Sequence, residues 1–165
     1  MTFFELRDLL ISHFGADVLL QENTQNPQPY LTIAAARITD VCRFLRNDSR
    51  SLFDRLACLT AIDNGPEAGT MEIIYNLHSI PYEQTLMLKV VVPRNAPGEP
   101  MPTVPSVSSV WRTADWHERE AFDLMGIRFE GHPDLRRILL PADWEGHPLR
   151  RDYQEQERYH GIVVR

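Results

Sequence analysis

Residues 70–78 read TMEIIYNLH and residues 85–93 read TLMLKVVVP, and the two stretches mark the chain as one that builds a β-sheet. Both are rich in β-branched and apolar residues and are bounded by turn signals, Gly65-Pro66 before the first and Ile80-Pro81 between the two. A third run of the same character covers residues 55–62. We therefore predict β-strands over residues 55–62, 70–78 and 85–93.

The amino-terminal residues predict a helix. Thr2 and Glu5 have the spacing of a capping box, in which each residue binds a free backbone amide at the helix start. Gly15 stands where a helix would end. The sequence thus predicts a helix over residues 3–14.

Two more strands and a second helix are expected before residue 50. Residues 17–21 and 30–35 resemble strands. Residues 38–47 have apolar side chains at helical spacing, so they predict an amphipathic helix whose buried face holds Ile38, Val41, Cys42 and Leu45. The fold class expected is α+β, a small mixed sheet flanked by two to three helices, with an extended C-terminal strap.

A proline-dense segment divides the chain. Pro93, Pro97, Pro100, Pro102 and Pro105 exclude a helix or a central strand there. The sequence after it is different, because residues 111–165 hold as many charged residues as residues 1–110, together with all three tryptophans. We therefore predict an α+β core domain over residues 1–104 and a partner-binding segment, one helix plus an extended Trp- and Arg-rich stretch, over residues 105–165.

Composition excludes several classes of protein. A net charge of −6 argues against a protein that coats nucleic acid or an anionic membrane surface. Cys42 and Cys58 are the only cysteines, so the chain cannot hold a four-thiolate metal or iron–sulfur site by itself. No signal peptide and no stretch long enough to span a bilayer is found in the sequence.

Asp115 and Glu118 have the spacing of an N-cap and its N3 partner, and Gly126 follows as a terminator, so residues 116–125 predict a helix. Glu118 lies in the middle of the apolar face of that helix. A carboxylate there is costly unless it is paired. Two interpretations stay open: Glu118 meets an arginine from elsewhere, or it folds back onto its own helix start.

Two similar motifs follow the helix, GHPDLRR at residues 131–137 and GHPLRR at residues 146–151. Each places a turn before a leucine and an arginine pair. Such a segment can lie along a partner surface with apolar side chains and cationic forks. The motifs are typical of an interaction segment rather than of a substrate pocket.

Catalytic alternatives have weaker support. His117-Glu118 begins like the zinc-protease motif HExxH, but Ala121 stands where the second histidine is needed. His132 and His147, with Asp134 and Asp143 nearby in sequence, have residue types that can bind a divalent ion, although capping of turns is the simpler interpretation. Glycine-rich phosphate loops and serine nucleophile elbows are absent from the sequence.

The runs EREAFDLMGI (118–127), FEGHPDLRRIL (129–139) and DWEGHPLRRDY (143–153) closely resemble one family. The family is the 30 kDa subunit of respiratory complex I, the bacterial form of which is the proton-translocating NADH:quinone oxidoreductase. The resemblance covers residues 105–153. Residues 1–104 are compatible with the family in length but carry no comparable signature.

The resemblance implies a non-catalytic peripheral-arm subunit with no cofactor of its own, in a complex that carries FMN, iron–sulfur clusters and quinone. Expected partners are the 49 kDa quinone-site subunit and the adjacent iron–sulfur subunits, without nucleic acid or direct membrane insertion. The expected location is the cytoplasmic face of the bacterial cell membrane. An equivalent subunit of a membrane-bound hydrogenase or of a ferredoxin- or F420-linked complex is the main alternative, and a metal-dependent hydrolase that uses Glu118, His132, Asp134 and His147 is a remote one.

The partner interface is expected in the carboxy-terminal third. The residues assigned to it are Trp116, Glu118, Arg119, Glu120, Asp123, His132, Leu135, Arg136, Arg137, Trp144, His147, Leu149, Arg150, Arg151, Asp152 and Tyr153.

Overall fold

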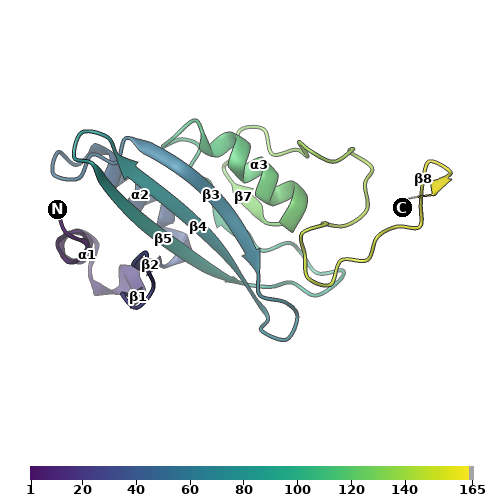
Figure 1. Cartoon of the computed structure of the whole chain (residues 1–165), viewed down its shortest axis with the longest axis horizontal. Helices are drawn as coiled ribbons and strands as arrows, with labels where there is room; N and C mark the ends of the chain where they lie inside the picture. The colour runs from purple at the N-terminus through teal and green to yellow at the C-terminus, as the bar shows by residue number, and fades with distance from the viewer. Residues whose placement is uncertain (164–165) are drawn as a thin grey trace.

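The computed structural model describes residues 1–163, which fold around one mixed sheet of five strands (Figure 1). Its strands are β1 (Leu19–Asn23), β2 (Tyr30–Ile33), β3 (Arg55–Asp63), β4 (Thr70–Ser79) and β5 (Gln84–Pro93), in the order β1-β2-β5-β4-β3. The pair β2 and β5 is parallel, whereas β1–β2, β5–β4 and β4–β3 are antiparallel. The expected α+β class with a small mixed sheet is confirmed.

Three α-helices accompany the sheet. They are α1 (Phe3–Phe14), α2 (Ile38–Asn47) and α3 (Ala114–Met125), and two short 3-10 turns, η1 (Ala16–Val18) and η2 (Ala35–Arg37), precede β1 and α2. Figure 1 shows α2 behind the sheet and α3 alongside the edge strand β3. The capping box of α1 forms as predicted, with Thr2 accepting from the amide of Glu5 and Glu5 accepting from the amide of Thr2.

The first predicted strand is displaced in the structure. Residues 17–21 were expected to be extended, but the chain makes the turn η1 first and β1 begins at Leu19. The turn lets the side chain of Val18 enter the core directly after α1 ends at Gly15. The other predicted strands and the helix over residues 38–47 are confirmed within a residue or two at each end.

The core lies between the sheet and α2. Alternate residues of β4 and β5 point into it, including Ile73, Tyr75 and Leu88, and Cys42 is fully buried there as predicted. The same core continues past the proline-dense segment, because Val107 and Phe129 belong to it. The change at residue 104 is therefore a change in sequence character, and its status as a domain boundary stays a prediction.

The proline-dense segment contains no helix between residues 94 and 105, and it ends in a short strand. This strand, β6 (Thr103–Pro105), pairs in parallel with β7 (Arg128–Glu130), which follows α3. Because β6 precedes α3 and β7 follows it, the pairing joins the two ends of the segment that contains α3, and the helix packs against β3. It also brings residues 106–111 next to α3, which decides the environment of Glu118.

Helix α3 starts earlier than predicted. It begins at Ala114, after Thr113, whose side chain makes no capping hydrogen bond. Asp115 is therefore inside the helix and the prediction that it is the N-cap is wrong. The preceding turn explains the shift, because the amides of Val110 and Ala114 already donate to the carbonyls of Val107 and Trp111. Gly126 ends the helix in the left-handed conformation, with φ of 68°, as expected.

Residues 131–163, here called the strap, are extended over α3 and then run away from the sheet (Figure 1). Their only regular structure is a small hairpin of β8 (Arg158–Tyr159) and β9 (Ile162–Val163). Between residues 1 and 163, no helix is both long and apolar enough to cross a membrane.

Candidate partner-binding surface

Asp123 on α3 holds the first half of the strap. One oxygen of its buried carboxylate accepts three consecutive backbone amides, from Ile138 at 3.1 Å, Leu139 at 2.8 Å and Leu140 at 2.9 Å. The other oxygen accepts from Arg137 at 2.9 Å. Burial by itself would raise the pKa of Asp123, but these donors outweigh it and keep the pKa below its usual value. The carboxylate is thus fixed in its charged form.

Arg137 extends this attachment to the second half of the strap. Its guanidinium donates to the carbonyl oxygens of Trp144 at 3.0 Å and Gly146 at 3.1 Å while it pairs with Asp123. A planar fork with five N–H groups can serve several acceptors at once. Arg137 therefore fixes the distance between the two motifs.

The second motif closes over the end of α3. His147 donates from Nδ1 to the carbonyl of Asp123 at 2.9 Å, and Arg150 donates to the carbonyls of Met125 at 2.8 Å and Gly126 at 3.1 Å. These are carbonyls that the end of a helix leaves free, and the helix dipole favours a cation there. Burial lowers the pKa of His147 and so favours the neutral form of the ring.

Gly126 makes this closure possible. A β-carbon at this position would lie 2.5 Å from Cδ2 and 2.6 Å from Nε2 of His147, and 2.9 Å from Nη2 of Arg150. The positive φ of Gly126 adds a second reason for glycine. Asp123, Gly126, Arg137, His147 and Arg150 are together called the Asp123 network below.

Glu118 is fully buried, and neither expectation for it is met. Instead of an arginine or its own helix start, its carboxylate accepts the hydroxyl of Ser106 at 2.5 Å and the amide of Val107 at 2.7 Å. Burial raises the pKa of Glu118 to about 7, against the opposing effect of these two hydrogen bonds. The residue therefore joins the segment after β6 to α3, with a carboxyl group that titrates near neutral pH.

His132 lies beside Glu118 but serves a structural turn. Its Nε2–H donates to the carbonyl of Asp115 at 3.1 Å, and its Nδ1 accepts the amide of Asp134 at 3.0 Å. Nε2 is 3.9 Å from the Glu118 carboxylate. His147 is held separately, against Asp123, and residues 1–163 contain no group of three His, Cys, Asp or Glu side chains placed to hold a metal ion.

The two motifs present opposite residues to solvent. In the first, Leu135 and Arg137 face inward and Arg136 is exposed. In the second, Arg150 faces inward while Leu149 and Arg151 are exposed. The sequence similarity therefore does not produce two equal surfaces.

The residues assigned to the interface fall into two groups. Those engaged within the chain, buried or partly so, are Glu118, Arg119, Asp123, His132, Leu135, Arg137, Trp144, His147, Arg150 and Tyr153. Those with exposed side chains are Trp116, Glu120, Arg136, Leu149, Arg151 and Asp152, of which Arg136 and Asp152 also form ion pairs within the chain. Interface formation remains a prediction for all of them, and the second group forms the outer surface of α3 and the strap.

The sequence did not point to the contacts that residues 150–152 of the strap make. Asp63, at the end of β3, forms a buried ion pair with Arg94 at 2.8 Å and accepts the amide of Arg151 at 3.0 Å. Arg94 also pairs with Asp152, and Asn95 accepts from Arg150 at 2.8 Å. The N–H donors at Asp63 keep its pKa low despite its burial. These partners lie far apart in the sequence, so no local pattern reveals them.

Comparisons with known proteins place the chain in one family. The family described as "Respiratory-chain NADH dehydrogenase, 30 Kd subunit" matches residues 31–159. The C subunit of NADH-quinone oxidoreductase from Chlorobium phaeobacteroides is 39% identical over 158 residues, which are 95% of this chain and 92% of that protein. The corresponding protein of Chloroherpeton thalassium is 49% identical over 122 residues, which are 73% of this chain but 48% of the relative, so the chain spans about half the length of that protein.

The fold is also found in a solved structure of another respiratory complex. It is a chain from the membrane-bound sulfane sulfur reductase, an archaeal respiratory membrane complex, with a TM-score of 0.72 and 23% identity over 92% of this chain and 85% of that one. The family match covers most of the described structure, from β2 through β8. The chain therefore belongs to the family of the 30 kDa subunit of respiratory-chain NADH dehydrogenase.

Proposed function

We propose that this chain is a non-catalytic subunit of the peripheral arm of a proton-translocating NADH:quinone oxidoreductase. Its role is to hold the quinone-site subunit and the neighbouring iron–sulfur subunits in fixed positions while electrons pass from NADH to quinone. FMN, the iron–sulfur clusters and quinone would belong to other polypeptides. The chain would lie at the cytoplasmic face of the membrane as a peripheral part of the complex.

One observation carries this proposal. The Asp123 network fixes an extended strap from inside, yet large apolar side chains on the outer surface of α3 and of the strap remain in water: Trp116 of α3 is 61% exposed and Leu149 of the strap is 59% exposed. Interfaces between subunits are enriched in aromatic residues and arginine, and their core positions are apolar. A rigid support whose exposed face carries apolar and charged side chains is suited to binding another polypeptide.

The rigidity of the strap has an energetic consequence for binding. A segment that becomes ordered only on contact loses conformational entropy at that moment, which weakens the association. Here, Asp123 and Arg137 already order residues 137–146 within the chain. The partner would then meet a preformed surface, and the distance between the bound subunits would be fixed by the strap.

The alternative is the same structural role in a related respiratory complex. The likeness to a chain of the sulfane sulfur reductase shows that this fold occurs beside other redox activities. Membrane-bound hydrogenases and ferredoxin- or F420-linked complexes belong to this alternative. NADH is the favoured donor because the curated relatives are named as C subunits of NADH-quinone oxidoreductase.

Native purification of the tagged chain from its host tests the proposal. We expect the tag to recover a multi-subunit assembly that contains a quinone-site subunit, iron–sulfur subunits and an NADH-binding subunit, with NADH-dependent quinone reduction. Recovery of the same subunits with a hydrogenase or ferredoxin module in place of the NADH-binding one would support the alternative. Recovery of the chain as a free monomer would contradict both.

A further inference from the structure

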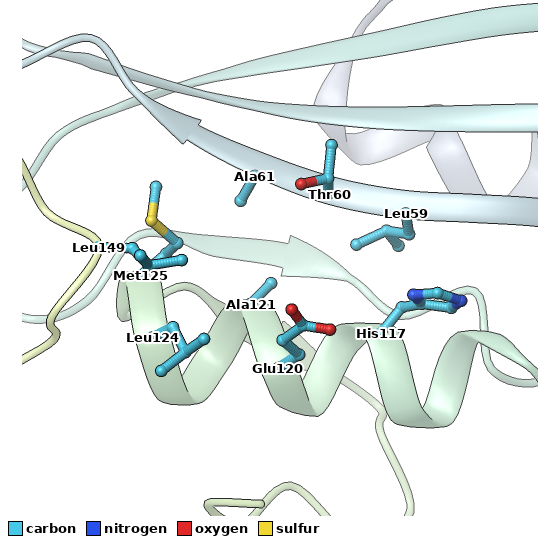
Figure 2. A pocket seen from close by; sticks show the side chains of 9 residues that line it. All are labelled: Leu59, Thr60, Ala61, His117, Glu120, Ala121, Leu124, Met125 and Leu149. Atoms are coloured by element: carbon cyan, nitrogen blue, oxygen red, sulfur yellow. The ribbon is translucent and has the colours of Figure 1, made fainter. Parts of the chain in front are cut away.

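A narrow groove lies between the edge strand β3 and helix α3 (Figure 2). It has a volume of about 30 Å³, and its lining includes Leu59, His117, Glu120, Ala121, Met125 and Leu149. Small-molecule and cofactor sites usually enclose roughly 300–1,000 Å³. The groove is therefore far too small for a cofactor, and it has room for little more than the end of one side chain.

The buried floor of the groove is apolar, whereas its walls combine the polar side chains of Thr60, His117 and Glu120 with one prominent apolar residue, Leu149. Leu59, Ala121 and Met125 are almost fully buried, whereas Leu149 is 59% exposed. The backbone of Leu149 is held against α3, because its amide donates to the carbonyl of Leu124 at 3.0 Å. A leucine that is held in place but left largely in water gains free energy when a partner covers it.

Glu120 gives the rim a negative charge. Its side chain is exposed, and among residues 1–163 no arginine, lysine or histidine forms an ion pair with it. Arg119, the cation nearest in sequence, is turned away and donates to the carbonyls of Arg136 and Arg137. His117 and Glu120 are three residues apart and thus share one face of α3 (Figure 2).

We propose that the groove between β3 and α3 receives one aliphatic side chain of a partner polypeptide while Glu120 pairs with a lysine or arginine next to it in that polypeptide. The proposal rests on the proposed function, since it identifies where and by what chemistry a neighbouring subunit is bound. The apolar floor and Leu149 bury the aliphatic group. Glu120 sets the register of the partner segment, because complementary charges at the rim of an interface select partners and orientation.

Four variants of the full chain, expressed in the host with a purification tag, test this. Leu149→Ser removes the apolar rim and Glu120→Arg reverses its charge. Ile80→Ser and Glu67→Arg are the matched controls, because Ile80 is 57% exposed and Glu67 is exposed, and both are outside the groove. We expect the first two variants to reduce recovery of the partner subunits at least about fivefold, a loss of about 1 kcal/mol, and the controls to leave it unchanged. Thermal melting of each variant checks that the fold itself is intact.

A photo-reactive residue in place of His117 identifies the occupant. Cross-linking in the native assembly followed by mass spectrometry is expected to map to a partner segment with an aliphatic residue adjacent to lysine or arginine. Mapping to an acidic or purely polar segment, or to a second copy of this chain, would overturn the proposal, as would unchanged recovery for both groove variants. If the groove variants assemble normally with their partners, the inference fails while the proposed function survives; if the parent chain is recovered alone, the proposed function itself fails.

Discussion

The sheet and the strap are held by different kinds of interaction. Strands β3 to β5 bury alternate apolar side chains against α2, so this part is stabilised by the hydrophobic effect spread over many residues. The strap has few buried apolar groups. It is held by a small number of hydrogen bonds and ion pairs, most of which meet at Asp123 and at the end of α3.

This difference shows how one chain provides both a stable body and an available surface. A sheet that distributes its stability tolerates the loss of a single contact. A strap that is held by a small number of polar groups keeps its apolar side chains free for another polypeptide but is sensitive to single substitutions. If the dependence on single groups is confined to α3 and the strap, substitutions there should loosen the strap and leave the sheet intact.

The largest effect is expected for Asp123→Ala. The substitution leaves Arg137 without its partner and three amides without an acceptor. Loss of one member of a buried pair typically costs about 3–5 kcal/mol, so exchange of the amides of residues 138–140 should accelerate by about a hundredfold or more. Hydrogen–deuterium exchange measures this directly.

Asp134→Ala is the control for that experiment, because Asp134 pairs with Arg136 in water. It should leave the exchange of residues 138–140 almost unchanged. Amides of β4 and β5 should stay protected in both variants. Equal acceleration in the sheet and the strap for Asp123→Ala would show that the two regions are not held separately.

Glu118→Gln should change the pH dependence of stability. The pKa of Glu118 is about 7 in the folded chain against an ordinary value of 4.5. The folded state then binds more protons than the unfolded state between these values, so the contribution of Glu118 to stability is complete below pH 4.5 and is lost as the pH rises to about 7. The full loss is about 3 kcal/mol. Glutamine can accept the amide of Val107 with its oxygen and donate its NH2 group to the hydroxyl oxygen of Ser106, so that both contacts are kept without a charge. The variant should therefore match or exceed the parent in stability at pH 8.

Urea unfolding of parent and variant at several pH values isolates this contribution. Lowered pKa values at Asp63 and Asp123 remove stability only below about pH 4, and the lowered pKa of His147 acts in the opposite direction to Glu118. Both proteins contain these groups, so their contributions cancel when the free energy of unfolding of the variant is subtracted from that of the parent. If the difference in free energy of unfolding between parent and variant stays constant from pH 4.5 to 8, the assigned environment of Glu118 is contradicted.

Gly126→Ala should have a smaller effect, which is confined to the second half of the strap. The added methyl group would clash with the ring of His147. The positive φ at this position is also a conformation that alanine disfavours. We expect a cost of about 1–3 kcal/mol and faster proteolysis near residues 147–151. Gly131→Ala also has a positive φ but meets no atom within 4 Å, so it separates backbone strain from the clash. If the two substitutions have equal effects, the close approach of His147 is not the reason that glycine is needed at position 126.

Arg136→Ala should affect folding least. Its ion pair with Asp134 is exposed, and such pairs contribute at most about 1 kcal/mol. Thermal unfolding of the full chain should be unchanged within error. If the outer surface binds a partner as proposed, the same substitution should still weaken recovery of the assembly, which would separate a binding role from a folding role.

The regular elements were predictable because their signals are local. The capping box at Thr2 and Glu5 and the apolar spacing in residues 38–47 each describe one element by itself. The start of α3 was missed because the turn before it, and not a side-chain cap, begins the helix.

The candidate surface was predictable in composition but not in geometry. Motifs of leucine and arginine indicated an interaction segment, but which arginine faces inward depends on contacts with α3. Glu118 was expected to need a partner, and its partner is set by β6, which brings Ser106 and Val107 to the helix. The contact between Asp63 and Arg151 joins residues 88 positions apart, beyond the reach of any periodic pattern.

Side-chain labelling by hydroxyl radicals, applied to the free chain and to the native assembly, tests the central claim most directly. The exposed Trp116 and Leu149 should be modified readily in the free chain and several-fold less in the assembly. Equal modification of both residues in the two samples would contradict the claim that this surface binds a partner polypeptide.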